Sequence, residues 1–408
     1  MKHIAVIGGG AAGTMAAYAA ALNGASVTVY EHNEKIGKKL FITGKGRCNL
    51  SNDCDTEEFF SHIPRNAKFL YSAVYTLPQT SLVGLFLEHG LATKVERGGR
   101  IFPMSDKSSD VIKTLEKMMK SVGVRICLNT GVRTVRKEGA LFTLENTDGK
   151  AYKFDRVIVA TGGISYKSTG STGDGYRFAR GMGLEVKDPK PTLVPLVIRE
   201  RHIAEGLQGL SLKNVVLSVA CGGKPVFSEM GELLFTHFGI SGPLVLSASA
   251  VMPFFQGARA EIDLKPALTE KVLDKRLLRD FEGNGQKRLK TAVSGLFPER
   301  LAKAVLEQAG LDEEKQIAEV TKADRERLIQ TAKRFSLHID GARSINEAIV
   351  TRGGVCVKEI DPSKMESKKV SGLYFAGEVI DVDGFTGGYN LQIAFSTGYL
   401  AGMSAAVD

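Results

Sequence analysis

The sequence has few cysteines, and no pattern among them builds a site. They form no CxxC pair, no histidine accompanies them at metal-ligand spacing, and their number is odd. A disulfide scaffold or a zinc site needs paired or clustered ligands at short spacing. We therefore expect reduced thiols, no disulfide framework and no metal site. The five cysteines are Cys48, Cys54, Cys127, Cys221 and Cys356.

The sequence also lacks a long hydrophobic run that could span a membrane. An Ala-rich stretch after Gly13 could be mistaken for a secretion signal, but glycines precede it and a turn and a strand follow it. The 408 residues are 43% hydrophobic and 24% charged, which is ordinary for a soluble globular protein of two or three domains. We expect a cytoplasmic protein with no membrane partner.

Acidic residues are fewer than basic ones. The counts of 45 and 54 leave a formal charge of +9, and the isoelectric point is near 9.1. This excess would help to attract polyanions or anionic substrates, but it identifies neither. A small-molecule substrate and RNA both stay open as partners, and the oligomeric state is not indicated.

The first 31 residues carry the strongest pattern. An apolar strand is predicted over His3–Ile7, an Ala-rich helix ends near Leu22, and a second strand over Val27–Tyr30 ends at Glu31. A glycine-rich turn between a strand and a helix, with an acid at the end of the next strand, is typical of a dinucleotide-binding βαβ unit. FAD and NAD are the cofactors that this unit could bind.

Each glycine of the turn has a mechanical role in such a unit. Gly8 permits the tight turn, Gly10 leaves room for a pyrophosphate, and Gly13 lets the helix pack closely on the strands. The helix N-terminus then faces the phosphates with free N–H groups and partial positive charge. Glu31 can accept hydrogen bonds from an adenosine ribose, and its carboxylate disfavours the 2′-phosphate of NADP at this site.

A long irregular segment, GKKLFITGKGRCNLSN, follows the second strand. Its backbone amides and the side chains of Lys38, Lys39, Lys45 and Arg47 could surround phosphates. Long loops of this kind in compact domains are usually functional. We expect this loop to cover the cofactor, with a solvated surface loop as the alternative.

Composition shifts divide the rest of the chain. Residues 1–190 form the first part of a cofactor domain, because short strands and the buried strand of DRVIVATGG follow the βαβ unit. Alternating patterns over residues 124–128, 132–136, 140–144 and 151–154 predict that the short strands form a small antiparallel element. A proline-rich boundary then opens a β-rich domain over 191–266. Helical periodicity with alternating charge predicts a helical insertion over 267–334, and those charges are read as solvated faces. The β-rich domain resumes over 335–355, and 356–408 returns to the cofactor domain.

The last segment contains a second strand, glycine and helix pattern. A buried strand over Leu373–Ala376 ends at Gly377-Glu378, and Gly387-Gly388 precede a helix that starts near Asn390. Backbone amides at that helix start could hold the pyrimidine edge of a flavin, where reduced flavin carries negative charge. Asp383 could bond the hydroxyl groups near the phosphates. Joined to the N-terminal pattern, this segment implies one cofactor domain built from both chain ends.

With these motifs together, the chain resembles the bacterial flavoprotein family described as HI0933-like or BaiN-like NAD(P)/FAD-dependent oxidoreductases. The resemblance runs from end to end, and no block of the family pattern is missing. The matching stretches are IAVIGGGAAG, TGKGRCNLSN, RGGRIFPMSDKSSDV, VIVATGGISYKSTGSTGDGY, GELLFTHFGISGP and GGVCVKEIDPSKMESKKVSGLYFAGEVIDVDGFTGGYNLQIAFSTG.

The resemblance implies an α/β protein in which a Rossmann-like FAD-binding domain from both termini carries an inserted β-barrel-like domain and a helical insertion. It also implies FAD, with NAD(P)H as co-substrate. By motif it places FAD contacts at Gly8, Gly10, Ala12, Gly13, Glu31, Arg47, Cys48, Ala160, Thr161, Gly162, Glu378, Asp383, Gly388 and Asn390. The candidate cofactor residues further include Ala11, Lys38, Lys39, Gly46, Val132, Gly377, Gly387 and Leu391.

The expected function is hydride transfer by the flavin to a small carbonyl, enone or amine substrate, because members of the family look like oxidoreductases of such compounds. Side chains then only position substrate and exchange protons. Candidates are Arg97 and Arg100 on the GGR turn, His237 in THFGISGP, and Tyr389 beside the flavin-facing helix. His237 could donate a proton near neutral pH, although such a residue is more often structural.

Three alternatives remain. Cys48 and Cys54 could form the pair of a flavin-linked disulfide reductase, but five residues separate them and no second GxGxxG follows another strand. Some family members resemble enzymes that reduce a base in RNA, so dihydrouridine-type chemistry or plain RNA binding is a second alternative, which salt would weaken steeply. A non-catalytic flavin sensor is the third.

Overall fold

The computed structural model describes residues 1–407 and divides into two compact units. Unit 1 comprises Met1–Thr192 together with the chain from Ile345 onward, and unit 2 comprises Leu193–Ser344. The two chain ends therefore build one unit, and a continuous insertion builds the other. The predicted fold class, a Rossmann-like domain from both termini with an inserted barrel and a helical insertion, is confirmed.

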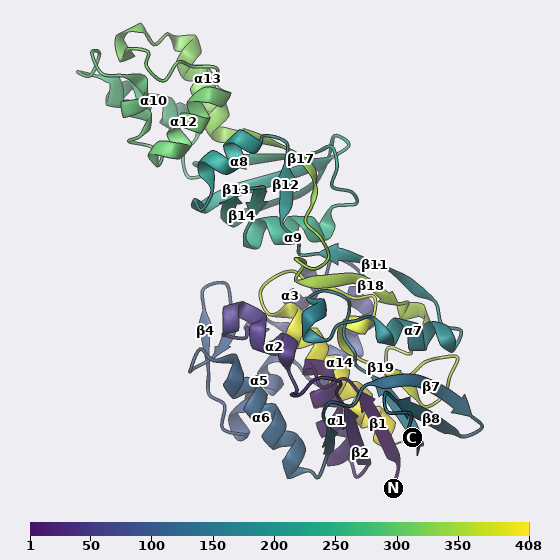
Figure 1. Cartoon of the computed structure of the whole chain (residues 1–408). Helices are drawn as coiled ribbons and strands as arrows, with labels where there is room; N and C mark the ends of the chain where they lie inside the picture. The colour runs from purple at the N-terminus through teal and green to yellow at the C-terminus, as the bar shows by residue number, and fades with distance from the viewer. Residues whose placement is uncertain (408) are drawn as a thin grey trace. The chain divides into compact units, whose positions relative to one another are not determined.

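Unit 1 is built on a parallel sheet with the strand order β19-β10-β1-β2-β6. In Figure 1 the purple N-terminal strands of this unit lie beside the yellow C-terminal helix. The apolar run of β1 is buried on both faces because helices cover the sheet. The strands are β1 (His3–Ile7), β2 (Ser26–Tyr30), β6 (Arg125–Cys127), β10 (Arg156–Val159) and β19 (Leu373–Phe375).

Two helices of unit 1 pack with their backbones in close approach. A Cβ added at Gly398 would lie 2.3 Å from the backbone oxygen of Ala12, and one added at Gly402 would lie 2.2 Å from that of Ala16. Only glycine allows α14 this close to α1. The helices of unit 1 are α1 (Ala11–Leu22), α2 (Lys38–Ile42), α3 (Thr56–Ser61), α4 (Tyr71–Thr76), α5 (Gln79–Glu88), α6 (Ser108–Ser121), α7 (Asp174–Gly181) and α14 (Tyr389–Val407).

Three small antiparallel sheets complete unit 1, in the orders β3-β5-β4, β7-β8-β9 and β11-β18. The alternation over residues 124–128 had suggested a further strand of an antiparallel element, and this is wrong, because β6 pairs in parallel with β2. The strands are β3 (Ser51–Asn52), β4 (Thr93–Glu96), β5 (Arg100–Pro103), β7 (Val132–Glu138), β8 (Leu141–Asn146), β9 (Ala151–Phe154), β11 (Val186–Thr192) and β18 (Val350–Val355).

Unit 2 contains a closed barrel with the strand order β12-β15-β14-β13-β16-β17. Alternating side chains of its strands fill the interior, as in β13, where every second residue from Val215 to Cys221 is buried. The strands are β12 (Leu196–Ile198), β13 (Ser211–Cys221), β14 (Lys224–Thr236), β15 (Gly239–Ser241), β16 (Ala258–Asp263) and β17 (Phe335–Ala342), and the barrel carries α8 (Arg201–Leu207) and α9 (Pro243–Val251).

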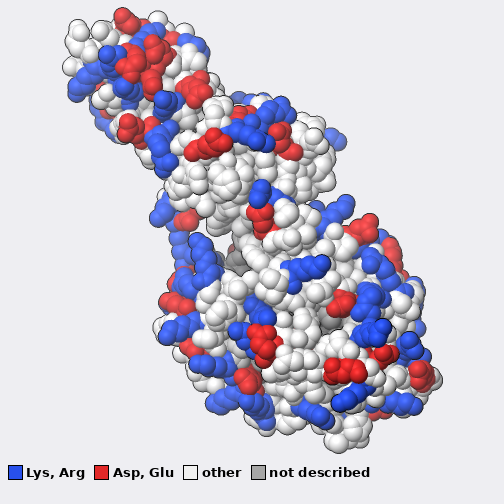
Figure 2. Space-filling model, in the orientation of Figure 1, with Lys and Arg blue, Asp and Glu red and all other residues white. Residues whose placement is uncertain are grey.

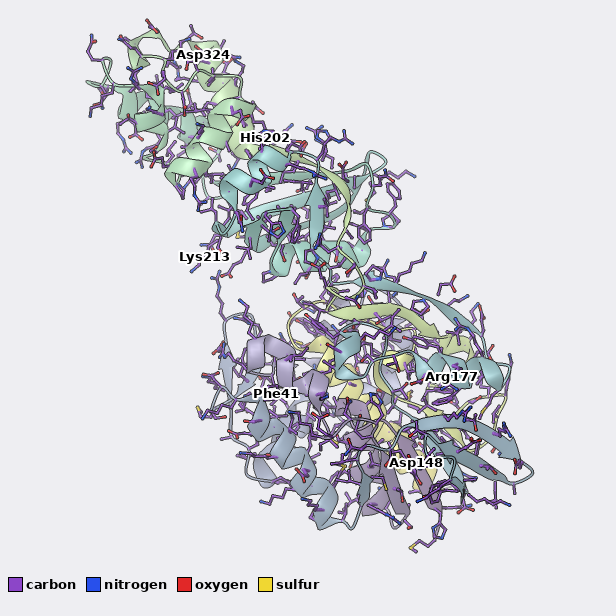
Figure 3. All side chains as sticks on the ribbon, viewed as in Figure 1. Phe41, Asp148, Arg177, His202, Lys213 and Asp324 are labelled. Atoms are coloured by element: carbon purple, nitrogen blue, oxygen red, sulfur yellow. The ribbon has the colours of Figure 1, made fainter. Side chains whose placement is uncertain are left out.

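Four helices lie between β16 and β17 in the sequence. Figure 3 labels Asp324 at the start of the last one, where its carboxylate and the Thr321 hydroxyl form a capping box. His202 on α8, also labelled, places Nε2 at 3.2 Å from a carboxylate oxygen of Glu307. The helices are α10 (Glu270–Phe281), α11 (Leu289–Val293), α12 (Glu299–Gln308) and α13 (Lys322–Lys333).

The junction back into unit 1 lies earlier than the sequence indicates. Residues 335–355 were all assigned to the barrel, but only β17 belongs to it, while β18 pairs with β11 in unit 1. Both segments are β-rich, so composition could not separate them. Within residues 1–407, no helix has both the length and the hydropathy that crossing a membrane requires.

Candidate functional site

The turn between β1 and α1 forms an open cradle at a helix N-terminus. Gly8 has φ of +106°, and a Cβ added at Gly13 would lie 1.8 Å from the Gly8 oxygen, so both positions need glycine. A Cβ added at Gly10 would meet nothing within 4 Å. Gly10 is the N-cap of α1, and no side chain caps the helix there. The first-turn amides therefore face open space, as a bound pyrophosphate requires.

Glu31 is the buried acid at the end of β2. One carboxylate oxygen accepts from the backbone amide of Gly9 at 2.8 Å, and the other accepts from the backbone and side-chain amides of Asn33 at 2.9 and 2.7 Å. A carboxylate has about four acceptor positions. One therefore remains for a ligand hydroxyl, and Asn33, which the sequence did not single out, orients the group.

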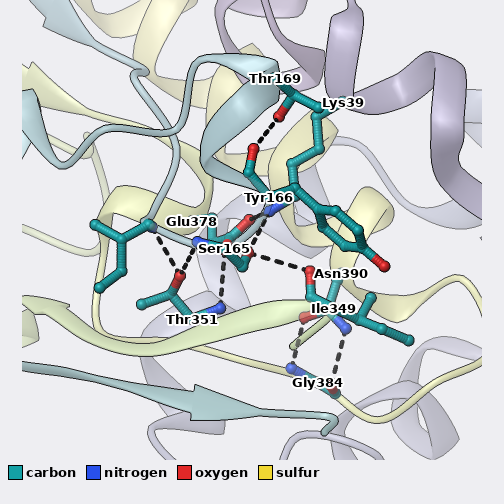
Figure 4. A network of polar contacts seen from close by, with 10 residues as sticks. Lys39, Ser165, Tyr166, Thr169, Ile349, Thr351, Glu378, Gly384 and Asn390 are labelled. Atoms are coloured by element: carbon teal, nitrogen blue, oxygen red, sulfur yellow. Dashed lines mark hydrogen bonds and ion pairs between the residues drawn. The ribbon is translucent and has the colours of Figure 1, made fainter. Parts of the chain in front are cut away.

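Glu378 joins four segments in the network drawn in Figure 4. Its Oε2 lies 2.7 Å from the Lys39 ammonium, and its Oε1 accepts from the Ser165 hydroxyl at 3.0 Å and the Thr351 amide at 2.8 Å. Lys39 also donates to the Ser165 hydroxyl at 2.7 Å. Lys39 and Glu378 were both predicted to bind cofactor. The structure brings them together as an ion pair that holds α2 against the chain after β19.

Two other basic side chains of the covering loop, Arg47 and Lys38, are also paired with acids. The Arg47 guanidinium bonds both Glu96 and Asp106, which raise its pKa, and it lies 4.1 Å from the centre of the Phe102 ring. Lys38 lies 2.8 Å from Glu34. These ion pairs hold the loop against neighbouring segments. The expectation that the cations of this loop surround phosphates stays a prediction.

Cys48 is a buried thiol in a left-handed backbone conformation. Its side chain is fully buried, φ is +60°, and burial raises its pKa to about 12. Cys54 is partly buried, and burial raises its pKa as well. Both are free thiols. A thiol needs to form thiolate to attack a disulfide, so the geometry argues against the disulfide-reductase alternative.

Alkylation tests the state of Cys48 directly. We expect iodoacetamide at mildly alkaline pH to leave Cys48 unmodified in the native protein and to label it after unfolding, because the thiolate is inaccessible and disfavoured. Mass spectrometry of digested protein would measure the labelling. Rapid labelling of Cys48 in folded protein, or a thiol that appears on reduction, would restore the disulfide-reductase alternative.

Two buried oxygens in segments predicted to bind cofactor have no hydrogen-bond partner among the described residues. They are Asn49 Oδ1, in the covering loop, and Thr161 Oγ1, just after β10. Buried polar atoms are nearly always paired in a complete protein. Such orphaned atoms, with the open space at Gly10, fit a unit that completes its polar contacts with a ligand such as FAD.

The loop before α14 comes close to β3. Gly387 and Gly388 have φ of +130° and +107°, and a Cβ at Gly388 would lie 2.1 Å from the Ser51 oxygen. Asn52 donates from Nδ2 to the Gly387 oxygen at 3.0 Å. The Asn390 side chain closes the loop by accepting from the Gly384 amide at 2.9 Å and donating to the Gly384 oxygen at 2.8 Å. The α14 N-terminus, with its partial positive charge, is thus held firmly.

Asp383 in the same loop is fully buried beside two arginines. Its carboxylate pairs with the Arg65 guanidinium and accepts from the Thr192 hydroxyl at 3.4 Å. The same guanidinium lies 3.4 Å from Asp381. Burial raises the pKa of Asp383, although Arg65 and Arg352 oppose that shift. These contacts lock the loop onto the segment after α3. They occupy two of the roughly four acceptor positions of this carboxylate, so a bond from Asp383 to cofactor hydroxyls stays a prediction.

The remaining predicted cofactor residues lie in unit 1 near these elements. A Cβ at Gly377 would lie 2.7 Å from the Ala12 side chain, so the end of β19 touches α1. Val132 begins β7, and Gly162 has φ of +73°. The set comprises Ala11, Ala12, Gly46, Val132, Ala160, Gly162, Gly377 and Leu391.

The three predicted catalytic residues have different surroundings. Tyr389 starts α14, is only 5% exposed, and stacks on the His62 ring. Arg100 donates from Nε to the Arg97 oxygen at 3.0 Å, within its own turn. His237 lies in unit 2 between β14 and β15, next to the Phe238 ring. Of the three, only Tyr389 packs against the loop that precedes α14.

The model of the HI0933-like protein Rossmann domain matches residues 2–404. The chain belongs to the HI0933-like family. The HI0933-like chain is 34% identical to the 3-dehydro-bile acid delta(4,6)-reductase of Clostridium scindens, over 100% of this chain and 99% of the relative. It is 33% identical to the ribosomal RNA dihydrouridine synthase of Haemophilus influenzae, over 98% and 97%.

Solved structures share the fold at low identity. The 3-ketosteroid-delta4-(5alpha)-dehydrogenase of Rhodococcus jostii aligns with a TM-score of 0.55 and 16% identity, over 100% of this chain and 97% of that one. The 3-ketosteroid delta1-dehydrogenase of Sterolibacterium denitrificans aligns with a TM-score of 0.53 and 14% identity, over the whole of both chains. The HI0933-like chain is an enzyme, an FAD-dependent oxidoreductase.

Proposed function

We propose that this enzyme takes hydride from NAD(P)H and delivers it to a carbon–carbon double bond conjugated to a carbonyl. The observation that carries the proposal is the open cradle at Gly10, in the same unit as the glycine loop that precedes α14. One FAD molecule would fill this site, with its pyrophosphate at the cradle and its flavin ring at the glycine loop.

Several elements of unit 1 contribute contacts to the proposed FAD site. The α1 N-terminus would hold the pyrophosphate, and the remaining acceptor position of Glu31 would take a ribose hydroxyl. The Lys39–Glu378 pair fixes the covering loop, and the amides before α14 would hold the pyrimidine edge. When bound, FAD supplies reversible hydride transfer, and the side chains need only orient substrate and move protons.

The chemistry named for the relatives narrows the acceptor. A 3-dehydro-bile acid with delta(4,6) double bonds is a conjugated ketone, and uridine carries its reducible double bond next to a carbonyl. Hydride addition to either bond places negative charge on the conjugated carbonyl oxygen, so one flavin site suits both. We therefore propose an enone-type acceptor rather than an amine or an isolated carbonyl.

The reductive half of the reaction is tested without knowing the natural acceptor. We expect purified protein to carry FAD and anaerobic NADH or NADPH to bleach its visible absorbance, because a competent flavin accepts nicotinamide hydride. Stopped-flow absorbance with each nicotinamide would show which one is preferred. Protein that takes up no FAD contradicts the cofactor site, and bound flavin that neither nicotinamide reduces contradicts the NAD(P)H assignment.

The acceptor is identified by reoxidising the reduced enzyme. Cyclohexenone and a steroid dienone should restore the flavin absorbance, and the corresponding saturated ketones should not. Reduction of uridine in ribosomal RNA is the second candidate, favoured by the Haemophilus influenzae relative. On the face drawn in Figure 2, basic and acidic side chains are interspersed, and no continuous basic surface is visible. RNA reduction that falls steeply with salt would favour RNA.

A further inference from the structure

We propose that His62 is the proton donor of this reaction and that its Nε2 delivers the proton to the acceptor carbon next to the carbonyl. The inference rests on the proposed enone reduction. His62 follows α3 and was not among the residues that the sequence pattern singled out.

His62 is bound to the loop that precedes α14. Its backbone oxygen accepts from the Phe385 amide at 2.9 Å, and a Cβ at Gly384 would lie 3.0 Å from both Ile63 and Tyr389. The segment after α3 therefore packs against this loop. Whatever the glycines and the α14 N-terminus hold lies within the neighbourhood of this histidine.

The imidazole ring is fixed in orientation by aromatic contacts. It stacks on the Tyr389 ring with 4.3 Å between ring centres and 9° between planes, and the edge of Phe385 lies 6.3 Å away at 89°. Tyr389 is itself buried against Phe59 at 5.6 Å. Tyr389 thus acts as a platform that positions His62, which explains a buried tyrosine at the start of α14.

One ring nitrogen is committed to the backbone and the other is not. Nδ1 lies 3.1 Å from the Glu58 carbonyl oxygen, which can only accept, so Nδ1 carries a proton. The Ser61 hydroxyl lies 3.2 Å from the same nitrogen. Nε2 has no hydrogen-bond partner among the described residues. It is free to bind and release the proton that a reaction exchanges.

The other histidines of unit 1 lie elsewhere in it. His3 begins β1, at the end of the sheet opposite the glycine turn. His32 follows the ribose-binding acid Glu31, and His89 packs edge-on against Tyr18 of α1. Of the four, His62 alone bonds the loop that precedes α14.

The proposed step balances in atoms and charge. Hydride adds to the far carbon of the double bond, and the electron pair of that bond moves toward the carbonyl as an enolate. The imidazolium of His62 gives its Nε2 proton to the carbon next to the carbonyl, which leaves a saturated ketone and a neutral imidazole. Water then reprotonates the ring, and NAD(P)H is the source of the two electrons.

His62→Gln is the test, and His89→Gln is its matched control. His89 also follows a helix, and its Nδ1 lies 2.8 Å from the carbonyl oxygen of Leu85, four residues earlier, so both variants lose the same helix-end contact. We expect His62→Gln to slow reoxidation by a steroid dienone about 100-fold, the low end for a lost general acid. FAD content, thermal midpoint and reduction by nicotinamide should match wild type, and His89→Gln should change none of these rates.

Two further readouts separate catalysis from a structural role. Imidazole in the buffer should restore part of the rate of His62→Ala. In wild-type NMR spectra, the ring signal that is missing from His62→Gln should shift when saturated steroid ketone is added to oxidised enzyme. Wild-type enzyme that reduces no enone contradicts the proposed function, whereas enone reduction with an unimpaired His62→Gln variant, or an unshifted His62 signal, contradicts the assignment of His62 alone.

Discussion

Gly10→Ala is expected to weaken FAD binding about 100-fold, or about 2.7 kcal/mol, while the protein stays folded. The added methyl meets no protein atom within 4 Å, so it occupies the space assigned to the pyrophosphate. Gly10 has φ of −83°, which alanine adopts without strain. The loss of a good N-cap and the smaller entropy of the unfolded chain offset each other to within about 1 kcal/mol.

Two other glycines make this prediction selective. Gly84→Ala inside α5 also meets nothing within 4 Å, so it should leave FAD affinity unchanged and raise stability by up to about 1 kcal/mol. Gly13→Ala should prevent stable folding, because its methyl would collide with the Gly8 oxygen. Titration of apoprotein with FAD, followed by flavin fluorescence, measures the affinities. Equal affinity for wild type and Gly10→Ala would refute the placement of the pyrophosphate.

Arg65→Leu is expected to destabilise unit 1 by about 3 kcal/mol, because it leaves a buried carboxylate without its ion partner. Asp383 is fully buried, whereas the Arg65 side chain is one-third exposed. The cost of an unpaired buried Asp383 carboxylate therefore exceeds the gain from removing the repulsion between Arg65 and Arg352. At roughly 2–4 °C per kcal/mol, the thermal midpoint should fall by about 6–12 °C.

The control for Arg65→Leu is an exposed pair of the same kind. Arg177 lies 2.8 Å from Asp174, with both side chains about half exposed, and Arg177→Leu should cost no more than about 1 kcal/mol. The double variant Arg65→Leu/Asp383→Asn should recover part of the stability. A double variant no more stable than Arg65→Leu would show that the charge on Asp383 is not the cause.

The pH dependence of Arg65→Leu follows from the direction of the Asp383 pKa shift. The folded-state pKa of this carboxyl is raised by burial, and removing Arg65 raises it further. The folded state then binds a proton more readily than the unfolded state, so stability rises as pH falls through the folded-state pKa. The gap in thermal midpoint between wild type and variant should therefore narrow from neutral to mildly acidic pH.

The sequence was sufficient for the parts of the fold that local patterns encode. β1 and α1 follow their predicted ranges because an apolar run, a glycine turn and an Ala-rich stretch adjoin one another. α14 begins within one residue of the expected start, because two glycines mark it. β6 and β18 were misplaced, since a short strand does not encode which sheet it joins.

The candidate site was harder to predict because its contacts span the chain. The motif supplied the glycines and Glu31, whose roles depend on neighbouring residues. The Arg65–Asp383 contact joins residues 318 apart, and the stacking of His62 on Tyr389 joins equally distant segments. No local sequence pattern predicts contacts between residues so far apart in the chain.

The pairing of β19 with β10 has a consequence for how the protein is made. During translation β10 emerges long before β19, and its free edge cannot be covered until more than 200 further residues are synthesised. Unit 2, by contrast, is one continuous stretch of the chain and can fold while the ribosome is still working. The nascent N-terminal segment therefore has an exposed strand edge that is prone to aggregation until β19 is made, and the proposed cofactor site is complete only after α14 has left the exit tunnel.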